Sequence, residues 1–251
     1  MKAKAASVVA HTIVRLLSVA IPATIIARTT AAQPAPAKTA FVAALGFVSA
    51  TGNTELSTLS VDDKLIHTDG RWTLSQLGAY VYGKTRGLET ANQLLFAGRA
   101  DYALQPRLTV FGGASFERNP FAGFRRRTDE IAGLSFKVLG GPTDFLSLDG
   151  GGVLTQESDV DGTHKSFPAA RLAGAYKHLF SKTAYFQQLA EYLPNLQTSG
   201  EYRVNTESSI VAPVSAHIGL KAAYAVRYDS RPPAGFGSTD RLLTTSVQIS
   251  Y

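Results

Sequence analysis

From residue 41 to the end of the chain, apolar and polar side chains alternate, and no stretch of sustained helical periodicity interrupts them. The segment AHIGLKAAYAVRYD shows this most clearly. Leu220 and Tyr224 fall on one face of an extended strand, whereas Lys221 and Arg227 fall on the other. The alternation therefore predicts β-strands that each have one apolar face and one polar face.

Turn signals divide this region into about twelve segments. The predicted strands are 41–51, 55–67, 72–84, 91–104, 107–119, 127–139, 143–155, 168–180, 184–194, 201–211, 215–229 and 239–251. Around 72–83 and 185–193 the apolar residues keep no single phase, so the facing of these two strands is ambiguous. An even number of antiparallel strands is typical of bacterial outer-membrane barrels.

The predicted connections alternate in length. TDGR, QP, GGP, SK and APV are short, whereas TRGLET, NPFAGFRR, ESDVDGTHK, PNLQTSG and SRPPAGFGS are longer; only the first connection, around TGNT, breaks the alternation. Outer-membrane barrels have short periplasmic turns and longer external loops. We therefore predict an all-β fold for 41–251, a transmembrane antiparallel up-and-down β-barrel of about twelve strands.

The cost of a charge in lipid predicts which face points inward. A Lys or Arg near the bilayer midplane costs about 2–4 kcal/mol, so the charged face should line the lumen. The charged residues expected there are Arg99, Asp101, Glu117, Lys137, Asp149, Arg171, Lys177, Arg203, Glu207, Lys221, Arg227 and Asp229. Their mixed signs favour ion pairs in a narrow or closed lumen over a wide, ion-selective pore.

The N-terminus has a positively charged start, the apolar stretch LLSVAIPATIIA, and small residues at Thr30 and Ala32. This combination is typical of a secretory signal peptide, predicted for 1–32. The apolar stretch is shorter than the ~20 residues that a membrane-spanning helix needs. A Pro/Ala-rich periplasmic linker is predicted for 33–40. A retained amphipathic anchor or a transit peptide remains the alternative for the N-terminus.

Composition excludes several kinds of site. Four of the 25 basic residues lie in 1–32, which leaves 21 basic against 19 acidic residues and a net charge of +2 for the rest. No basic stripe lies on a patterned helix, so nucleic-acid binding is not expected. The chain has no cysteine, and its five histidines lack zinc-site spacing, so we predict no metal and no cofactor.

Two short motifs have a chemical interpretation and a simpler one. His164 and Ser166 have the spacing of the outer-membrane phospholipase nucleophile pair, but an ordinary loop is favoured. The DVDG sequence at 159–162 has two acids and a glycine, as calcium loops do, but a hairpin turn is favoured. No catalytic residue is predicted.

Positive charge is most concentrated at Arg118, Arg125, Arg126 and Arg127, which are expected in an external loop or at the outer rim. Guanidinium groups there could bind lipopolysaccharide phosphates, with a solvated loop as the alternative.

At the C-terminus, alternating apolar residues end on an aromatic, at Val247, Ile249 and Tyr251. This ending resembles the C-terminal signal that the barrel-assembly machinery recognises.

Three segments, GFVSATGNTELSTLSV, FGGASFERNPFAGFRRRTDEIAGLSFKVL and YAVRYDSRPPAGFGSTDRLLTTSVQISY, resemble the YdiY-like family of salt-induced outer membrane proteins. The resemblance extends over 45–251 and is most specific at 52–54 and 233–240. It implies an outer-membrane barrel and carries no established catalytic residues.

The sequence thus favours a non-enzymatic barrel in the outer membrane of a Gram-negative bacterium, either an envelope component or a narrow passive pore. Its expected partners are outer-membrane lipids, lipopolysaccharide and, during biogenesis, the assembly machinery; the sequence does not set the number of copies. A small-solute channel proper, a lipid-acting enzyme and a soluble ligand-binding barrel remain as alternatives.

A closed barrel resists detergent, so we expect unheated protein from outer-membrane fractions to migrate faster on a gel than boiled protein. The measurement is the gel shift between unheated and boiled samples. Identical migration would contradict a compact barrel.

Overall fold

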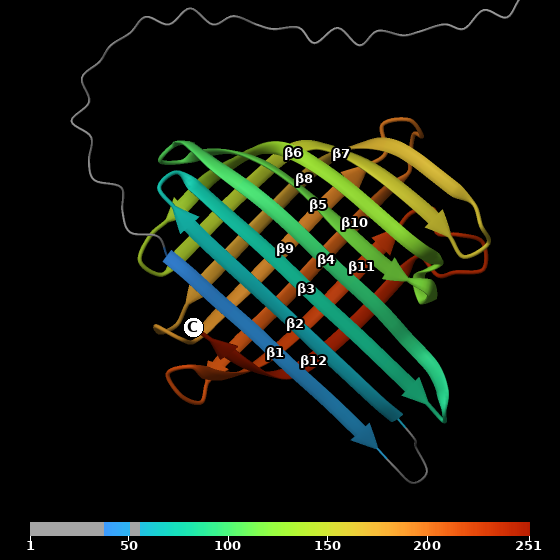
Figure 1. Cartoon of the computed structure of the whole chain (residues 1–251), viewed down its shortest axis with the longest axis horizontal. Helices are drawn as coiled ribbons and strands as arrows, with labels where there is room; N and C mark the ends of the chain where they lie inside the picture. Colours follow the sequence, from blue (N-terminus) through green and yellow to red (C-terminus); the bar gives the residue numbers. More distant parts are fainter. Residues whose placement is uncertain (1–37, 51–55) are drawn as a thin grey trace, which may run out of the picture. The chain divides into compact units, whose positions relative to one another are not determined.

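A computed structural model describes residues 38–50 and 56–251. The described residues form a closed antiparallel barrel in which twelve strands follow in chain order and β12 pairs with β1 (Figure 1). The strands are β1 (Lys38–Ala50), β2 (Leu56–Asp69), β3 (Trp72–Thr85), β4 (Leu88–Gln105), β5 (Leu108–Asn119), β6 (Phe124–Gly140), β7 (Asp144–Asp159), β8 (His164–Leu179), β9 (Tyr185–Pro194), β10 (Tyr202–Pro213), β11 (Ile218–Asp229) and β12 (Thr239–Ser250). The predicted twelve-stranded up-and-down barrel is confirmed.

The described chain contains one short helix, the 3₁₀ turn η1 (Pro120–Ala122) between β5 and β6. Asn119 caps η1, because its side-chain Oδ1 accepts a hydrogen bond from the backbone N–H of Ala122 at 3.2 Å. No helix within residues 38–50 and 56–251 is long and apolar enough to cross a membrane.

β1 begins three residues earlier than predicted. Lys38 stands opposite Thr68, because β2 extends far enough to pair with it. The last three residues of the linker predicted at 33–40 therefore belong to β1. The signal peptide predicted for 1–32 lies outside the described residues.

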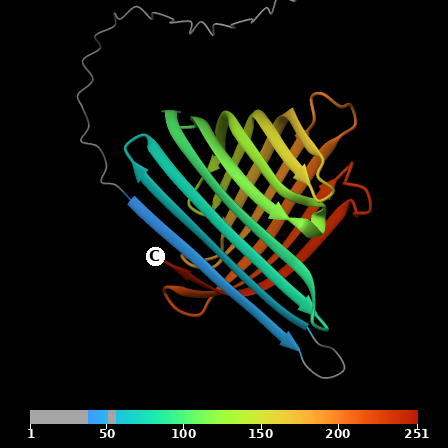
Figure 2. The same ribbon diagram turned by 45° about the vertical axis from the view of Figure 1, so that its right-hand side comes forward.

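Most strands are longer than predicted, so some connections are shorter. β3 and β4 are joined by Arg86 and Gly87 alone, where a six-residue loop was expected. Both residues have positive φ, 51° and 75°, as in the two-residue turns of hairpins. The alternation of connection lengths is therefore weaker than the sequence indicates. We call the end with the connections after β2, β4, β6, β8 and β10 the turn end, and the opposite end, which carries the long connections 195–201 and 230–238, the loop end (Figure 2).

The outer face of the barrel is apolar. Large hydrophobic side chains from most strands lie on it, each 49–70% exposed: Leu45, Leu74, Phe96, Leu134, Leu148, Leu172, Leu220 and Leu243. A continuous apolar surface of this kind is found where a protein contacts lipid rather than water. The facing contradicts the alternative of a soluble barrel, which would need polar residues outside.

Aromatic residues gather at both edges of this apolar surface. At the turn end, the ring centroids of Trp72 and Tyr102 are 4.9 Å apart. At the loop end, the ring of Tyr202 lies 5.6 Å from those of both Tyr192 and Tyr228. Such girdles mark the two membrane–water interfaces of transmembrane barrels.

Part of the lumen is filled by packed apolar side chains. Val153, Ala169 and Leu193 are buried there, and Ile131 packs against them. Phe111, only 3% exposed, fits against the backbone of β6 because Gly133 has no side chain. A Cβ added at Gly133 would lie 2.9 Å from Phe111 Cζ, which is closer than such contacts normally occur.

We therefore expect Gly133→Val to destabilise the barrel by about 1–3 kcal/mol through overpacking. The measurement is urea unfolding of protein refolded into lipid vesicles. The matched control is Gly150→Ala, since a Cβ there meets no atom within 4 Å. Equal stability of the two variants would contradict the close packing at Gly133.

Candidate functional site in the lumen

The lumen contains two adjacent cavities. The turn-end chamber, of about 630 Å³, is lined mainly by polar and charged residues of β2 to β11. The loop-end chamber, of about 320 Å³, lies beneath η1 and the long connections. Four side chains line both chambers and define the waist between them: Arg171, Glu191, Asn205 and Arg227.

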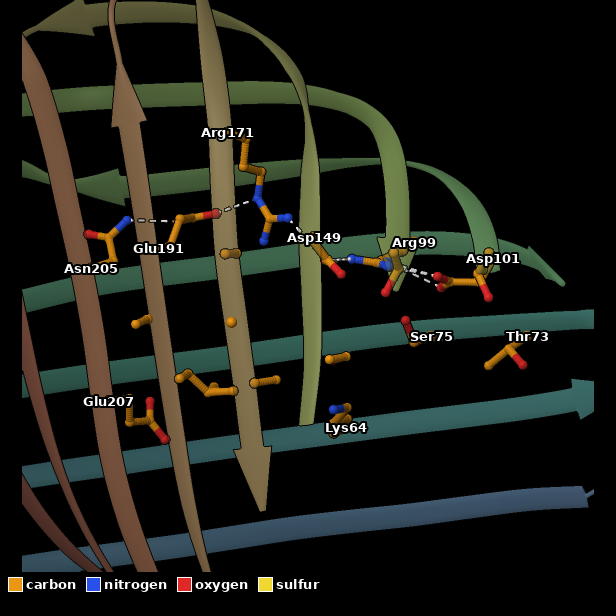
Figure 3. Close-up of a pocket in the computed structure, with 18 of the residues that line it drawn as sticks. Lys64, Thr73, Ser75, Arg99, Asp101, Asp149, Arg171, Glu191, Asn205 and Glu207 are labelled. Atoms are coloured by element: carbon orange, nitrogen blue, oxygen red, sulfur yellow. Dashed lines mark hydrogen bonds and ion pairs between the residues drawn. The ribbon is translucent and has the colours of Figure 1, made fainter. Parts of the chain in front are cut away.

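A chain of ion pairs crosses the wall of the turn-end chamber (Figure 3). We call it the ion-pair ladder; its members come from β4, β7, β8, β9 and β10 and are Asp101, Arg99, Asp149, Arg171, Glu191 and Asn205. Arg99 donates to Asp101 at 2.8 Å and to Asp149 at 2.6 Å. Arg171 donates to the same Asp149 oxygen at 3.1 Å and to Glu191 at 2.5 Å. Each guanidinium thus joins two carboxylates, an arrangement that compensates for partial desolvation of all of them.

The ladder rests on an aromatic ring. The guanidinium carbon of Arg99 lies 3.7 Å from the ring centroid of Phe111, and that of Arg171 lies 5.9 Å from it. Both cations are attracted by the ring face. Because Phe111 is itself held against glycine backbone, the ladder has a rigid support.

The waist is polar and carries charges that are mostly paired. Asn205 Nδ2 donates to Glu191 at 3.0 Å, so Glu191 is held by a cation on one side and an amide on the other. Arg227 donates to Glu117 across the lumen, from β11 to β5. The waist therefore presents hydrogen-bonding groups whose charges are already balanced.

The loop-end chamber has a more deeply buried set of pairs. Arg203, 9% exposed, donates to Asp129 at 3.2 Å and to Thr155 Oγ1 at 2.9 Å. Thr155 in turn donates to Asp129 at 2.6 Å. Since the three groups satisfy one another, a buried guanidinium is tolerated at this position.

Some charged side chains of the turn-end chamber lie outside the ladder. Within the described residues, Lys64 and Glu207 have no ion-pair partner within 4.0 Å, and Figure 3 shows Lys64 apart from the ladder. Lys177, which lines a separate small cavity at the turn end, lies 3.9 Å above the ring of Tyr185. Five basic and four acidic residues line this chamber, so its charge is close to neutral.

All twelve charged residues predicted for the lumen occupy inward-facing positions. Ten of them line the two chambers or form ion pairs inside the barrel. Lys177 lines a small cavity at the turn end, and Lys137 stands opposite the inward-facing Ser147 and is exposed. The geometry therefore brings most, but not all, of the predicted set together at the waist and its flanks.

Several lumen residues escaped the sequence analysis: Asp62, Lys64, Asp129, Glu157 and Glu191. Glu191 lies in β9, where the alternation of apolar and polar residues is ambiguous because the polar Gln188 occupies an outward position. Asp129 shares its inward face with the apolar Ile131, so the inward face of β6 could not be recognised as polar from the sequence. The inward position of Asp62 was readable from the alternation of β2.

The four arginines assigned to lipopolysaccharide contact do not share one location. A β-bulge between Phe124 and Arg126 shifts the register of β6. Arg127 points into the lumen because it is in phase with Asp129 and Ile131 of the same strand. It pairs there with Glu157 and stacks on Phe124, so its expected external position is wrong. Arg118 and Arg126 occupy outward positions near the loop end, and Arg125 donates to the carbonyl of Val160 at 2.9 Å.

The three residues of the proposed assembly signal lie on the outer face. Val247, Ile249 and Tyr251 are 47%, 40% and 73% exposed. The backbone N–H of Tyr251 donates to the carbonyl of Phe41 at 2.8 Å, and its carbonyl accepts from the Phe41 N–H at 2.9 Å. The last residue is thus held in the sheet, as the alternation indicates.

The two ambiguous motifs adopt ordinary geometry. His164 shares a hydrogen bond of 2.8 Å with Ser158 rather than with Ser166. Asp161 accepts a hydrogen bond from the backbone N–H of Thr163 at 2.8 Å in the turn before β8, and this bond lowers the pKa of the carboxyl group. Gly162 has a φ of 93°, which fits a glycine turn. No group of three or more metal-ligating side chains occurs in the part of the chain that the structure describes.

A profile of the family described as "Protein of unknown function, DUF481" matches residues 43–251. The chain belongs to this family. The uncharacterized protein YdiY of Escherichia coli (strain K12) is 27% identical over 221 residues, which cover 87% of this chain and 86% of YdiY. The predicted resemblance to YdiY-like proteins is confirmed.

Solved structures of a porin and of an outer membrane channel are similar to this chain. The NanC porin superposes with a TM-score of 0.50 at 11% identity, covering 84% of this chain and 97% of the porin. An outer membrane channel from Pseudomonas putida F1 has a TM-score of 0.47 at 12% identity, covering 91% and 100%. At such identities the NanC likeness shows that this DUF481 member has the porin-type transmembrane fold.

The buried Arg203 gives a test of the loop-end chamber. We expect Asp129→Asn to lower the free energy of unfolding by about 3–5 kcal/mol, because it leaves the buried guanidinium uncompensated. The measurement is urea unfolding in lipid vesicles. Replacing both partners, in Asp129→Leu with Arg203→Met, should recover most of the loss. A double variant as unstable as the single one would contradict this account.

Proposed function

We propose that the protein is a narrow passive pore in the outer membrane of a Gram-negative bacterium, through which small polar solutes pass without chemical change. The observation that carries this proposal is the pair of polar chambers, about 630 and 320 Å³, that share the four residues of the waist. A lumen filled only for stability would need no adjacent polar cavities of this size.

The surface chemistry supports the proposed location. An apolar band with aromatic girdles at both edges matches a bilayer, and charged residues at mid-height lie inside. The likeness to the NanC porin shows the same fold, which in that protein forms a porin. The proposal does not depend on whether salt induces the production of the protein.

The balance of charges at the waist suggests what would pass. A ring of one sign would select ions of the opposite sign. Here Arg171 and Arg227 each have a carboxylate partner, so the local field is small and long-range attraction of ions is weak. We therefore expect weak ion selectivity and preferential passage of small uncharged or zwitterionic solutes that can exchange hydrogen bonds with the waist.

The contacts with the membrane follow from the same placement. Arg118 and Arg126 point outward near the loop end, where we propose that they bind lipopolysaccharide phosphates. Val247, Ile249 and Tyr251 would be read by the barrel-assembly machinery before β12 joins the sheet.

Conductance of the refolded protein in planar bilayers tests the pore. Truncating both members of a waist pair, in Arg171→Ala with Glu191→Ala, removes bulk without changing net charge. We expect single-channel conductance to rise roughly two-fold, because both side chains lie where the two chambers meet and their removal widens that passage. Lys137→Ala at the turn end is the matched control and should leave conductance unchanged.

If neither the wild-type protein nor the double variant conducts, the barrel is a closed envelope component. A conductance rise of equal size in Lys137→Ala would show that the waist does not limit flow.

A further inference from the structure

The connection between β11 and β12, residues 230–238, reaches over the loop end of the barrel; we call it the strap (Figure 2). Its tip packs on the connection between β5 and β6, which contains η1. A Cβ added at Gly123 would lie 2.7 Å from Pro233 Cγ and 2.9 Å from Phe236 Cδ2, so the two connections touch because this residue has no side chain. The resemblance to the YdiY-like family is among the most specific here, at 233–240.

The strap and η1 come from opposite sides of the barrel. In the closed order of twelve strands, β5 and β11 are six positions apart, and so are β6 and β12. Their connections therefore meet across the mouth rather than along the wall. Two ion pairs join the same walls beneath them. Arg227 of β11 donates to Glu117 of β5, and Arg127 of β6 lies 3.7 Å from Asp229 of β11.

The strap and η1 together form the outer wall of the loop-end chamber. Pro232, Gly237 and Ser238 of the strap line this chamber, as do Ala122 of η1 and its cap Asn119. Among the described residues that line the turn-end chamber, none comes from either connection. The strap therefore covers one of the two chambers, on the side that faces out of the barrel.

The base of the strap is hydrogen-bonded, whereas its tip is held on η1 by packing alone. The backbone N–H of Asp229 donates to the carbonyl of Ser238 at 2.9 Å, and that of Ser230 donates to the carbonyl of Tyr202 at 3.0 Å. In the described part of the chain, no hydrogen bond joins 232–237 to η1 or to its flanking residues. The two prolines of the strap have no backbone N–H to donate. Contacts of this kind can open locally while the sheet stays folded.

The tip is a compact turn that can move as one unit. The backbone N–H of Phe236 donates to the carbonyl of Pro233 at 3.1 Å. Between them, Gly235 has a φ of 88°, which glycine adopts without strain. Release of the tip therefore requires only the loss of its contacts on η1, and the turn itself is kept.

We propose that the strap is a gate over the loop-end chamber. In the closed state its tip packs on Gly123; in the open state the tip leaves η1 and the chamber opens to the outside. The rival interpretation is a fixed cover that braces the two walls, but the two ion pairs beneath already provide that bracing. The proposal rests on the pore proposed above for what the gate controls, whereas the movement of the strap does not depend on conduction.

Cysteine labelling can measure the opening of the strap, because the chain has no native cysteine. Ser115→Cys places a thiol in the loop-end chamber. Ser147→Cys places one in the turn-end chamber, which the strap does not cover, and is the matched control. Each is combined with Phe236→Ser, which removes the ring that packs on η1. The proteins are refolded in detergent micelles, and the rate of reaction with an excess of a charged maleimide is measured.

We expect Phe236→Ser to raise the labelling rate of Ser115→Cys by roughly ten-fold, because loss of a packed aromatic ring shifts the equilibrium between closed and open strap by at least this factor. The labelling rate of Ser147→Cys should not change. Equal rates at position 115 with and without Phe236→Ser would overturn the proposal. So would equal acceleration at both positions, since it would indicate a general loosening of the barrel.

A disulfide between the tip and η1 tests whether the strap limits conduction. A Cβ at Gly123 would lie 2.9 Å from Pro233 Cβ, and disulfides join Cβ atoms about 3.5–4.5 Å apart, so Gly123→Cys with Pro233→Cys requires only a small shift of the strap. Ala43→Cys with Ile249→Cys, opposed residues of β1 and β12, cross-links the sheet, leaves the strap free and is the matched control. Each protein is compared with itself before and after reduction, so any strain at position 123 is common to both measurements.

We expect oxidation of the strap pair to lower the mean conductance in planar bilayers by roughly five-fold or more, with recovery on reduction, because a locked strap keeps the chamber closed. Oxidation of the control pair should have no effect. Equal conductance of the oxidised and reduced strap pair, in a barrel that conducts, would refute the gate and leave the pore intact. If no protein conducts but Phe236→Ser still accelerates labelling at position 115, the pore fails and the strap remains a movable cover.

Discussion

The structure depends on one constraint: backbone N–H and C=O groups that cross a bilayer must find partners within the protein, because hydrocarbon offers none. A sheet meets this requirement only by closing on itself. Closure makes one face of every strand lipid-facing and the other lumen-facing, so charged residues can be placed only at alternate positions. The polar chambers, the waist and the ion-pair ladder all follow from this division.

The same constraint explains how much of the fold the sequence discloses. Strand number and facing are encoded locally, in the two-residue period, and Lys221 and Arg227 were placed inside from this period alone. Arg127 was misplaced because β6 begins at Phe124, three residues before the predicted strand, so that Arg127 lies within the sheet rather than at its edge. The two-residue turn at Arg86 and Gly87 was predicted as a longer loop, because the neighbouring residues are compatible with either a strand or a loop.

The candidate site was less predictable, because its contacts cross the lumen. Arg99 and Asp149 lie 50 positions apart, and Lys221 and Asp62 lie 159 positions apart. Which inward side chains meet depends on the tilt and stagger of the closed sheet, and no local pattern encodes these quantities. The sequence identified most of the charged groups that face the lumen, whereas the pairing among them required the three-dimensional arrangement.

The rung that joins Phe41 to Tyr251 has a consequence for folding kinetics. It links residues near opposite ends of the polypeptide, so it is among the most non-local contacts that the molecule makes. Loop-closure entropy makes such contacts slow to form, and a sheet that is still open has two unpaired edge strands that can pair with other chains. The ring of strands must therefore be completed late, and a chaperone or membrane catalyst that shields β1 while β12 arrives would govern the yield of native protein.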